Sequence, residues 1–196
     1  MMFDISPMKW LEIIAVILAI LCVWQTVKEN IWCWITGSVS NLLFCYAFFT
    51  ARLYSDMALQ LVYVLLNAYG WYQWLHGGKR QSSLSVTMTT IRTWIVLALV
   101  ALILTSALGQ WLSLHTNTDV PYWDATTTVM SLVAQFMLAK KLIENWWIWI
   151  SVNVMYIGIY YYKMLYLTSG LQIIFIALSI MGYLEWKKSL RAAEEA

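Results

Sequence analysis

Long apolar stretches separated by short polar segments run along the whole chain. Windows of about 20 apolar residues match the ~30 Å hydrocarbon core of a bilayer, so each window predicts a membrane-spanning helix. With two prolines and eight glycines, the windows are largely unbroken, which favours helices over the ~10-residue alternating segments of a membrane β-barrel. The predicted helices cover residues 10–27, 31–50, 55–75, 92–114, 122–139, 145–162 and 166–186.

Composition strengthens this interpretation. Of the 196 residues, 62% are hydrophobic and 11% are charged, and the mean hydropathy is +0.67. Soluble domains carry about 25% charged residues. The formal net charge of +2 is too small for a nucleic-acid binder, so we expect no nucleic-acid partner. We therefore predict an all-α integral membrane protein with seven transmembrane helices in the lipid bilayer.

Basic residues indicate which side of the membrane each loop occupies, because cationic loops resist translocation. If the N-terminus lies outside, the lysines and arginines left outside are Lys9, Arg52 and Lys163, and the other nine of the 12 lie inside. The sequence therefore predicts an outer N-terminus and an inner C-terminus. The basic, Gly/Ser-rich segment at 77–83 and the Ser/Thr residues after it are expected to form a flexible cytoplasmic linker.

An internal repeat with an offset of 112 residues is the most informative feature. Aligning residues 28–74 with residues 140–186 gives 11 identities in 47 positions without a gap. Hydrophobic bias does not explain matched Asn, Gln, Tyr, Gly and Trp at one offset, so we infer a duplication. The identical pairs are Lys28/Lys140, Ile31/Ile143, Trp34/Trp146, Asn41/Asn153, Leu53/Leu165, Tyr54/Tyr166, Leu59/Leu171, Gln60/Gln172, Leu66/Leu178, Gly70/Gly182 and Trp74/Trp186.

The repeat also predicts how the chain is divided. Residues 1–75 and 115–196 form two related three-helix bundles, and residues 76–114 supply the linker and an unpaired fourth helix. Both bundles then enter the membrane in the same direction, as a parallel 3+1+3 repeat. Repeats of this kind leave a solute pathway between the halves, with a site near mid-depth. A duplicated bundle without a pathway is the alternative.

Polar and aromatic residues recur on one face of four predicted helices. An amide in hydrocarbon is costly unless it is hydrogen-bonded, so these groups should face a cavity or a partner. Four such stripes favour a shared binding cavity over amides that only join helix to helix. The stripes are Trp146, Trp149, Asn153, Tyr156 and Tyr160; Trp34, Gly37, Asn41, Phe44 and Phe48; Gln60, Tyr63 and Asn67; and Asp124, Thr128, Ser131 and Gln135.

Such a cavity offers flat π-faces, amides and hydroxyls without a buried charge. It suits a planar, polyhydroxylated, cationic solute, because Trp and Tyr faces attract cations. The carboxylates Glu12, Asp56 and Asp124 fall near helix starts, where the helix dipole stabilises them, so ion coupling is not expected. The sequence holds no nucleophile–base pair, metal-ligand cluster or phosphate loop, and we predict no enzymatic activity, catalytic residue, metal or cofactor.

Several motifs resemble the PnuC-type nicotinamide riboside transporter family. Trp146, Trp149 and Asn153 form a Trp-x-x-Trp-x-x-x-Asn pattern similar to that family's sixth helix. Residues 67–74 resemble its third-helix ending, and Trp123-Asp124 resembles the start of its fifth helix. The likeness covers nearly the whole chain and is weakest at the N-terminus, in the linker and in the fourth helix.

The resemblance implies a fold related to the SWEET sugar transporters and vitamin uptake across the bacterial inner membrane. It implies facilitated diffusion of nicotinamide riboside with trapping by cytoplasmic phosphorylation, and it suggests homotrimers. Similar proteins carry thiamine or riboflavin, and the residues do not separate these substrates. A non-transporting membrane binding subunit is the alternative from another class. Together with the stripes, the resemblance predicts substrate binding by Asn41, Gln60, Tyr63, Asn67, Gln135, Trp146, Trp149, Asn153 and Tyr156.

Overall fold

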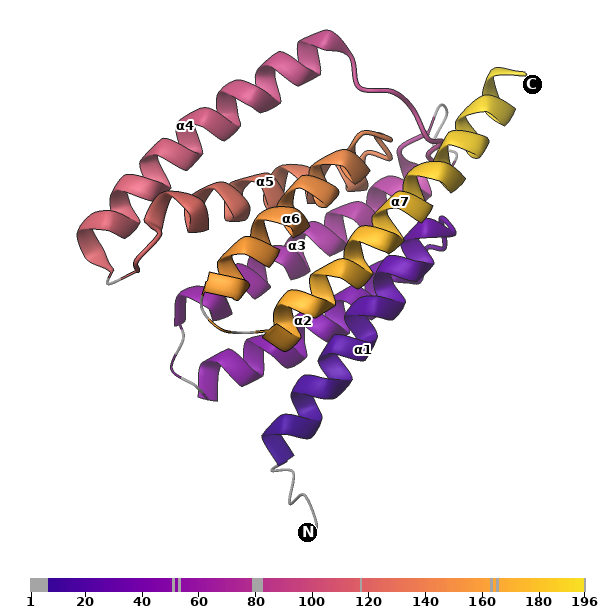
Figure 1. Cartoon of the computed structure of the whole chain (residues 1–196). Coiled ribbons are helices and arrows are strands. Elements are labelled where there is room, and N and C mark those ends of the chain that lie inside the picture. The colour runs from indigo at the N-terminus through magenta and orange to yellow at the C-terminus, as the bar shows by residue number, and fades with distance from the viewer. Residues whose placement is uncertain are drawn as a thin grey trace. The chain divides into compact units, whose positions relative to one another are not determined.

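The computed structural model describes residues 7–50, 52, 54–78, 83–116, 118–162, 164 and 166–195. Residues 79–82 of the predicted linker, the repeat pair Leu53/Leu165 and Lys163 lie outside this part of the chain. The described residues form seven helices (Figure 1), which confirms the all-helical prediction: α1 (Pro7–Val27), α2 (Cys33–Thr50), α3 (Tyr54–His76), α4 (Ile91–His115), α5 (Pro121–Ala139), α6 (Asn145–Tyr162) and α7 (Tyr166–Glu194). Only α7 runs well past its predicted end, because the charges after Trp186 end the apolar stretch but not the helix.

Four of these helices are long and apolar enough to cross a membrane by length and composition alone. The other three, α3, α5 and α6, carry most of the amides, hydroxyls and aromatic rings of the predicted polar stripes, which lowers their hydropathy. Three of the four helices expected to bind a polar solute are therefore among the less apolar ones, and α2, which carries Asn41, is the exception. The four apolar windows are Lys9–Val27, Cys33–Thr50, Ile91–His115 and Thr168–Ala192.

The chain forms two compact units, Met1–Leu84 and Ser85–Ala196. In the first unit α2 packs against both α1 and α3, and in the second α6 packs against both α5 and α7. The hydroxyl of Ser40 on α2 donates a 2.8 Å hydrogen bond to the carbonyl of Ala15 on α1. The finer division at residues 75 and 115 remains a prediction.

The 112-residue repeat is visible in the backbone of the two units. Helices α2 and α6 begin and end at equivalent residues, and α3 and α7 begin at equivalent residues. The turns after α1 and α5 are closed by the same backbone hydrogen bonds and place Glu29 and Lys141 at positive φ, 53° and 50°. Arg52 and Met164 match in the same way, at 61° and 58°. Non-glycine residues rarely adopt this conformation, so its recurrence supports the inferred duplication.

A pair of tryptophans lies inside each unit. In the first, the rings of Trp34 on α2 and Trp74 on α3 meet edge to face, with centroids 5.3 Å apart and planes at 87°. In the second, Trp146 on α6 and Trp186 on α7 meet at 5.3 Å and 82°. All four side chains are buried. Edge-to-face contact is a preferred arrangement of aromatic rings, so each pair joins two helices in a defined geometry.

Each of these contacts requires a glycine on the neighbouring helix. A Cβ atom on Gly70 would collide with the ring of Trp34, and a Cβ atom on Gly182 would collide with the ring of Trp146. Helices in a bilayer gain little from the hydrophobic effect when they associate, so they depend on close packing at small residues. The glycine therefore lets the indole approach the helix backbone.

Residues 85–90, which precede α4, lie along the turn between α5 and α6. The N–H of Thr87 donates to the carbonyl of Lys141, and the N–H of Ile143 donates to the carbonyl of Thr87, at 3.1 and 3.0 Å. The N–H and the hydroxyl of Thr89 both donate to the carboxylate of Glu144, at 3.0 and 2.6 Å. The expectation of a flexible linker is therefore wrong for this segment.

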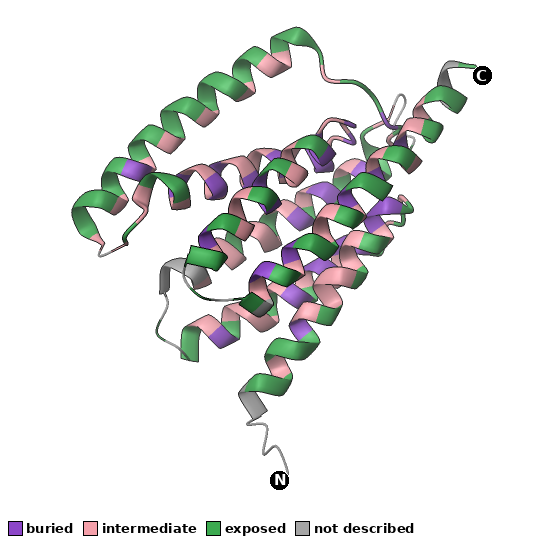
Figure 2. Ribbon diagram, viewed as in Figure 1, coloured by how far each residue is buried: buried purple, intermediate pink, exposed green. Residues whose placement is uncertain are grey.

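Helix α4 packs against α5 and is otherwise exposed, as the green ribbon in Figure 2 shows. Its close approach to α5 is at the buried Gly109, where a Cβ atom would collide with the ring of Tyr122. A helix that is apolar around its circumference and little buried is suited to contact with lipid.

Replacing Gly182 with alanine is expected to destabilise the protein by about 1–3 kcal/mol, because the added methyl group forces Trp146 from its position. The midpoint of thermal unfolding of the purified protein in detergent measures this. Gly170→Ala is the matched control, because nothing lies within 4 Å of its Cβ position, and this variant should keep or slightly raise the midpoint. Equal midpoints for all three proteins would contradict the packing role of Gly182.

Replacing Glu144 with alanine should release the segment before α4, because Thr89 loses the acceptor for two donors and each such bond to a charged group contributes about 1.5–3 kcal/mol. Limited proteolysis with chymotrypsin should then cut after Leu84 or Met88 about tenfold faster or more. Glu195→Ala removes an exposed carboxylate near the end of α7 and serves as the control. Unchanged cleavage in Glu144→Ala would show that the backbone hydrogen bonds of Thr87 with Lys141 and Ile143 are enough to hold the segment.

Candidate functional site

The nine side chains predicted to bind substrate belong to both units, four to the first and five to the second. Asn67, Trp146 and Asn153 are buried, and the other six are half-buried. None of the nine is exposed in the way that the large apolar side chains of α4 are. Four helices supply them: α2 carries Asn41; α3 carries Gln60, Tyr63 and Asn67; α5 carries Gln135; and α6 carries Trp146, Trp149, Asn153 and Tyr156.

The predicted stripe on α6 lies on an unbroken helix, so its spacing of three and four residues keeps its members on one face. At the far end of the stripe, the rings of Tyr156 and Tyr160 stack with centroids 5.5 Å apart and planes at 10°. The equivalent rings on α2, Phe44 and Phe48, stack in the same way at 6.1 Å and 21°. Each unit therefore has a pair of stacked aromatic rings at equivalent positions. The pair in the second unit also has hydroxyl groups, because both of its rings are tyrosines.

Trp146 has a packing role that the stripe alone did not reveal. Its ring lies against Gly182 and Trp186, and both of these residues belong to the pairs matched by the repeat. The repeat therefore contained the signal for this cluster. The buried Nε1 of Trp146 has no hydrogen-bond partner among the described residues, and neither has that of Trp34. A buried donor without an acceptor is costly, so these indole N–H groups are open to a water molecule or a ligand.

The predicted stripe on α5 divides into an anchor and a pair of interior polar groups. The carboxylate of Asp124 in the first turn accepts a 2.6 Å hydrogen bond from the hydroxyl of Thr118, which ties it to the helix start as expected. Further along the helix, Ser131 is buried and Gln135 is half-buried. The Ser131 hydroxyl has no partner within the part of the chain that the structure covers. The interior of α5 thus offers a hydroxyl and an amide.

Asn67 lies where the three helices of the first unit meet. An added Cβ atom on Gly37 of α2 would lie 3.2 Å from Nδ2 of Asn67 on α3 and 2.9 Å from Sγ of Cys22 on α1. The Cys22 thiol donates to the carbonyl of Cys33 at 3.1 Å, which limits its freedom to move aside. The missing side chain at Gly37 therefore makes room for the Asn67 amide.

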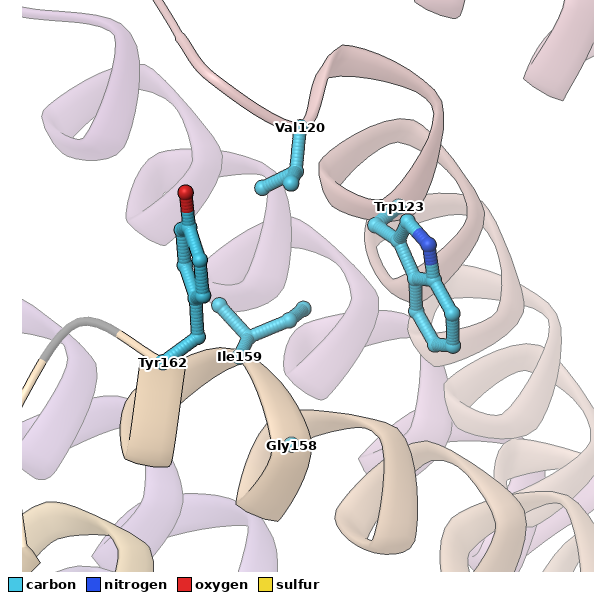
Figure 3. A pocket seen from close by; sticks show the side chains of 5 residues that line it. All are labelled: Val120, Trp123, Gly158, Ile159 and Tyr162. Carbon is cyan, nitrogen blue, oxygen red and sulfur yellow. The ribbon is translucent and has the colours of Figure 1, made fainter.

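A hollow of about 260 Å³ opens in the second unit where α5 begins and α6 ends (Figure 3). The rings of Trp123 and Tyr162 stand on either side of it, and a Cβ atom at Gly158 would meet nothing within 4 Å. The nine predicted site residues do not line this hollow. Aromatic rings at helix ends are typical of membrane interfaces. The lining residues are Val120, Trp123, Gly158, Ile159 and Tyr162.

The titratable groups of the described chain do not gather into a reactive centre. Its His, Cys, Asp and Glu side chains form no group of three that could hold a metal ion. His76 stacks on Tyr72 at 4.9 Å and His115 stacks on Trp111 at 5.4 Å, and both histidines are exposed in the last turn of a helix. These positions fit interface anchors better than binding groups.

The family described as "Nicotinamide mononucleotide transporter" matches residues 9–188 of this chain. The nicotinamide riboside transporter PnuC of Neisseria mucosa is 28% identical over 203 residues, covering 96% of this chain and 76% of that protein. PnuC of Escherichia coli is 29% identical over 214 residues, covering 96% and 88%. The riboflavin/roseoflavin transporter RibM of Streptomyces davaonensis is 23% identical over 181 residues, covering 90% and 84%.

A solved structure described as the crystal structure of the vitamin B3 transporter PnuC superposes with a TM-score of 0.75 at 27% identity. The match covers 95% of this chain and 84% of that one. The fold, the family match and the curated relatives thus agree over nearly the whole sequence. This chain belongs to the nicotinamide mononucleotide transporter family and is a multi-pass membrane protein.

Proposed function

We propose that this protein carries nicotinamide riboside across the bacterial inner membrane by facilitated diffusion. The printed names of its relatives in Neisseria mucosa and Escherichia coli support this substrate. The observation that carries the proposal is the set of nine uncharged amide and aromatic side chains, all buried or half-buried, on helices that are otherwise rich in apolar residues.

The chemistry of these side chains suits the substrate. Nicotinamide riboside has a pyridinium ring, ribose hydroxyls and a carboxamide. The faces of Trp149 and Tyr156 attract a flat cation, because an aromatic face carries negative charge density. The amides of Asn41, Asn67 and Asn153 can each donate and accept hydrogen bonds with the hydroxyls and the carboxamide. The set contains no cationic residue, which disfavours an anionic substrate.

The transport cycle alternates access to the bound solute from the two sides of the membrane, and the solute is trapped inside by phosphorylation. The proposed cycle needs no ion gradient, and the absence of a carboxylate among the nine predicted site residues supports this. Asp124 on the α5 stripe is engaged by Thr118 at the helix start, and this fits an anchor better than a proton relay. The chain itself performs no chemical conversion.

We also propose an orientation and an assembly for the protein. An outer N-terminus leaves nine of the 12 lysines and arginines on the inner side, as the distribution of basic residues in membrane proteins favours. The family resemblance supports assembly into homotrimers. Both points are open to direct measurement, by labelling of the termini and by mass determination in detergent.

A second candidate is another flat aromatic vitamin, thiamine or riboflavin. The similarity to RibM favours this alternative, because a relative over 90% of the chain is named for riboflavin and roseoflavin. Calorimetric titration of the purified protein with nicotinamide riboside, thiamine and riboflavin side by side separates the candidates. Tightest binding of nicotinamide riboside supports the first proposal, and preference for either other vitamin replaces it.

The purified protein in liposomes is expected to equilibrate labelled nicotinamide riboside without any ion gradient. The uptake should stop when the inner and outer concentrations are equal, because a uniporter moves its substrate only down its gradient. Liposomes without the protein provide the background. Uptake that requires a proton or sodium gradient would contradict the uniport mechanism, and the absence of uptake would favour a binding subunit.

Asn153→Ala is expected to weaken substrate binding by about 1–3 kcal/mol, or roughly 5- to 150-fold in Kd, because one side of a buried polar contact is lost. Isothermal calorimetry with nicotinamide riboside measures the change. Ser151→Ala is the control on the same helix, because the exposed Ser151 hydroxyl donates only to the carbonyl of Trp147 in its own helix. An unchanged Kd in folded Asn153→Ala protein would remove Asn153 from the site.

A further inference from the structure

The two units provide an internal comparison, because the 112-residue repeat relates α1, α2 and α3 of the first unit to α5, α6 and α7 of the second. Features that both units keep, such as the tryptophan pair on its glycine, maintain the fold. Positions where the units differ while the helices keep their geometry are candidates for a specialised role. The junction around Gly37 is such a position.

At this junction the equivalent positions of the two units carry side chains of opposite size. In the first unit, the smallest residue lies on the middle helix and two polar side chains fill the space beside it. In the second unit, the residue on the middle helix is an indole and its two counterparts are small. The three equivalent pairs, in the order of the first unit, are Cys22/Ala134, Gly37/Trp149 and Asn67/Ser179.

The polar group at the junction also differs between the two units. The hydroxyl of Ser179 donates to the carbonyl of Phe175 in its own helix at 2.7 Å and so serves its own backbone. Asn67 has a longer side chain, and its amide nitrogen reaches the space above Gly37. The first unit therefore offers an amide at this junction, and the second offers the half-buried indole of Trp149.

We propose that Gly37 is a positioning residue that determines specificity, because its missing side chain lets Asn67 present its amide to the carboxamide of the substrate. The inference rests on the proposed function, in which Asn67 is one of the binding residues. An asparagine amide has two donors and one acceptor group, which complement those of a carboxamide. The amide of Asn67 then binds the polar substituent of the substrate ring.

The selectivity of binding distinguishes the loss of the Asn67 contact from general damage to the fold, because general damage would weaken the binding of both ligands. The two ligands are nicotinamide riboside and the pyridinium riboside that lacks the carboxamide, each titrated by calorimetry into the full chain in detergent. Gly37→Ala should raise the Kd of nicotinamide riboside about tenfold, because the methyl group displaces the amide. The Kd of the analogue should stay within about twofold, because it has no group for the amide to bind.

Asn67→Ser introduces the residue of the second unit and should give the same selective loss. The double variant should lose no more than either single variant, because both act through one amide and such effects are not additive. Asn67→Ser also makes room for the methyl group of Gly37→Ala. The double variant therefore keeps the test available if the single Gly37→Ala protein folds poorly.

Two further variants separate other causes. Gly158→Ala adds a methyl group in open space and should leave both Kd values unchanged. Cys22→Ala in the Gly37→Ala background removes the thiol contact, and it should not restore the binding of nicotinamide riboside. If it does restore binding, the loss arose through Cys22 and the proposal for Asn67 is overturned.

Other outcomes also decide the question. Equal weakening of both ligands by Gly37→Ala, or effects of Gly37→Ala and Asn67→Ser that multiply, would limit Gly37 to a role in the fold. If the unaltered chain binds nicotinamide riboside and both substitutions leave its Kd unchanged, only this inference fails. If the unaltered chain does not bind nicotinamide riboside, the proposed function fails and the inference fails with it.

Discussion

Close contact between an indole ring and a helix glycine is the interaction on which each unit depends. Lipid tails are as apolar as leucine, so burying more leucine between helices gains little in a bilayer. Van der Waals contact at short range must then hold the helices together. Trp34 over Gly70 and Trp146 over Gly182 provide that contact at the same place in both units. An edge-to-face partner on the next helix fixes the orientation of each ring.

Much of the fold could be predicted from the sequence, because hydropathy and duplication leave strong signals. Apolar windows located all seven helices to within a few residues, apart from the end of α7. The fixed offset of the repeat was enough to link Gly70 to Gly182 and Trp34 to Trp146. The packing of the two units explains why these pairs match, since each glycine and each indole must be kept together. The prediction of a flexible linker failed for residues 85–90, because their Ser/Thr-rich composition does not reveal that a carboxylate from a distant turn will bind the backbone.

The candidate site was less accessible to sequence reasoning. Spacing along a helix predicts which side chains share a face, and all nine predicted residues are buried or half-buried, which is consistent with this. Spacing does not predict how far a helix is rotated against its neighbours, and so it could not show that Trp146 packs on Gly182 or that Asn67 fills the space at Gly37. Those contacts depend on the distance between helix axes, and the absence of a Cβ atom at a single glycine is enough to change that distance.

The lengths of the helices that carry the candidate site have a physical consequence. Helices α2 and α6, with 18 residues each, are the shortest of the described chain and span about 27 Å, whereas the 25 residues of α4 span about 37 Å. A bilayer core of ~30 Å is a little thicker than the short helices are long and thinner than α4 is long, so the bilayer thins beside the short helices or α4 tilts. Thinning at α2 and α6 shortens the dry part of the route that a polar solute has to cross. The permeation rate of such a carrier then depends on the acyl-chain length of the surrounding lipids.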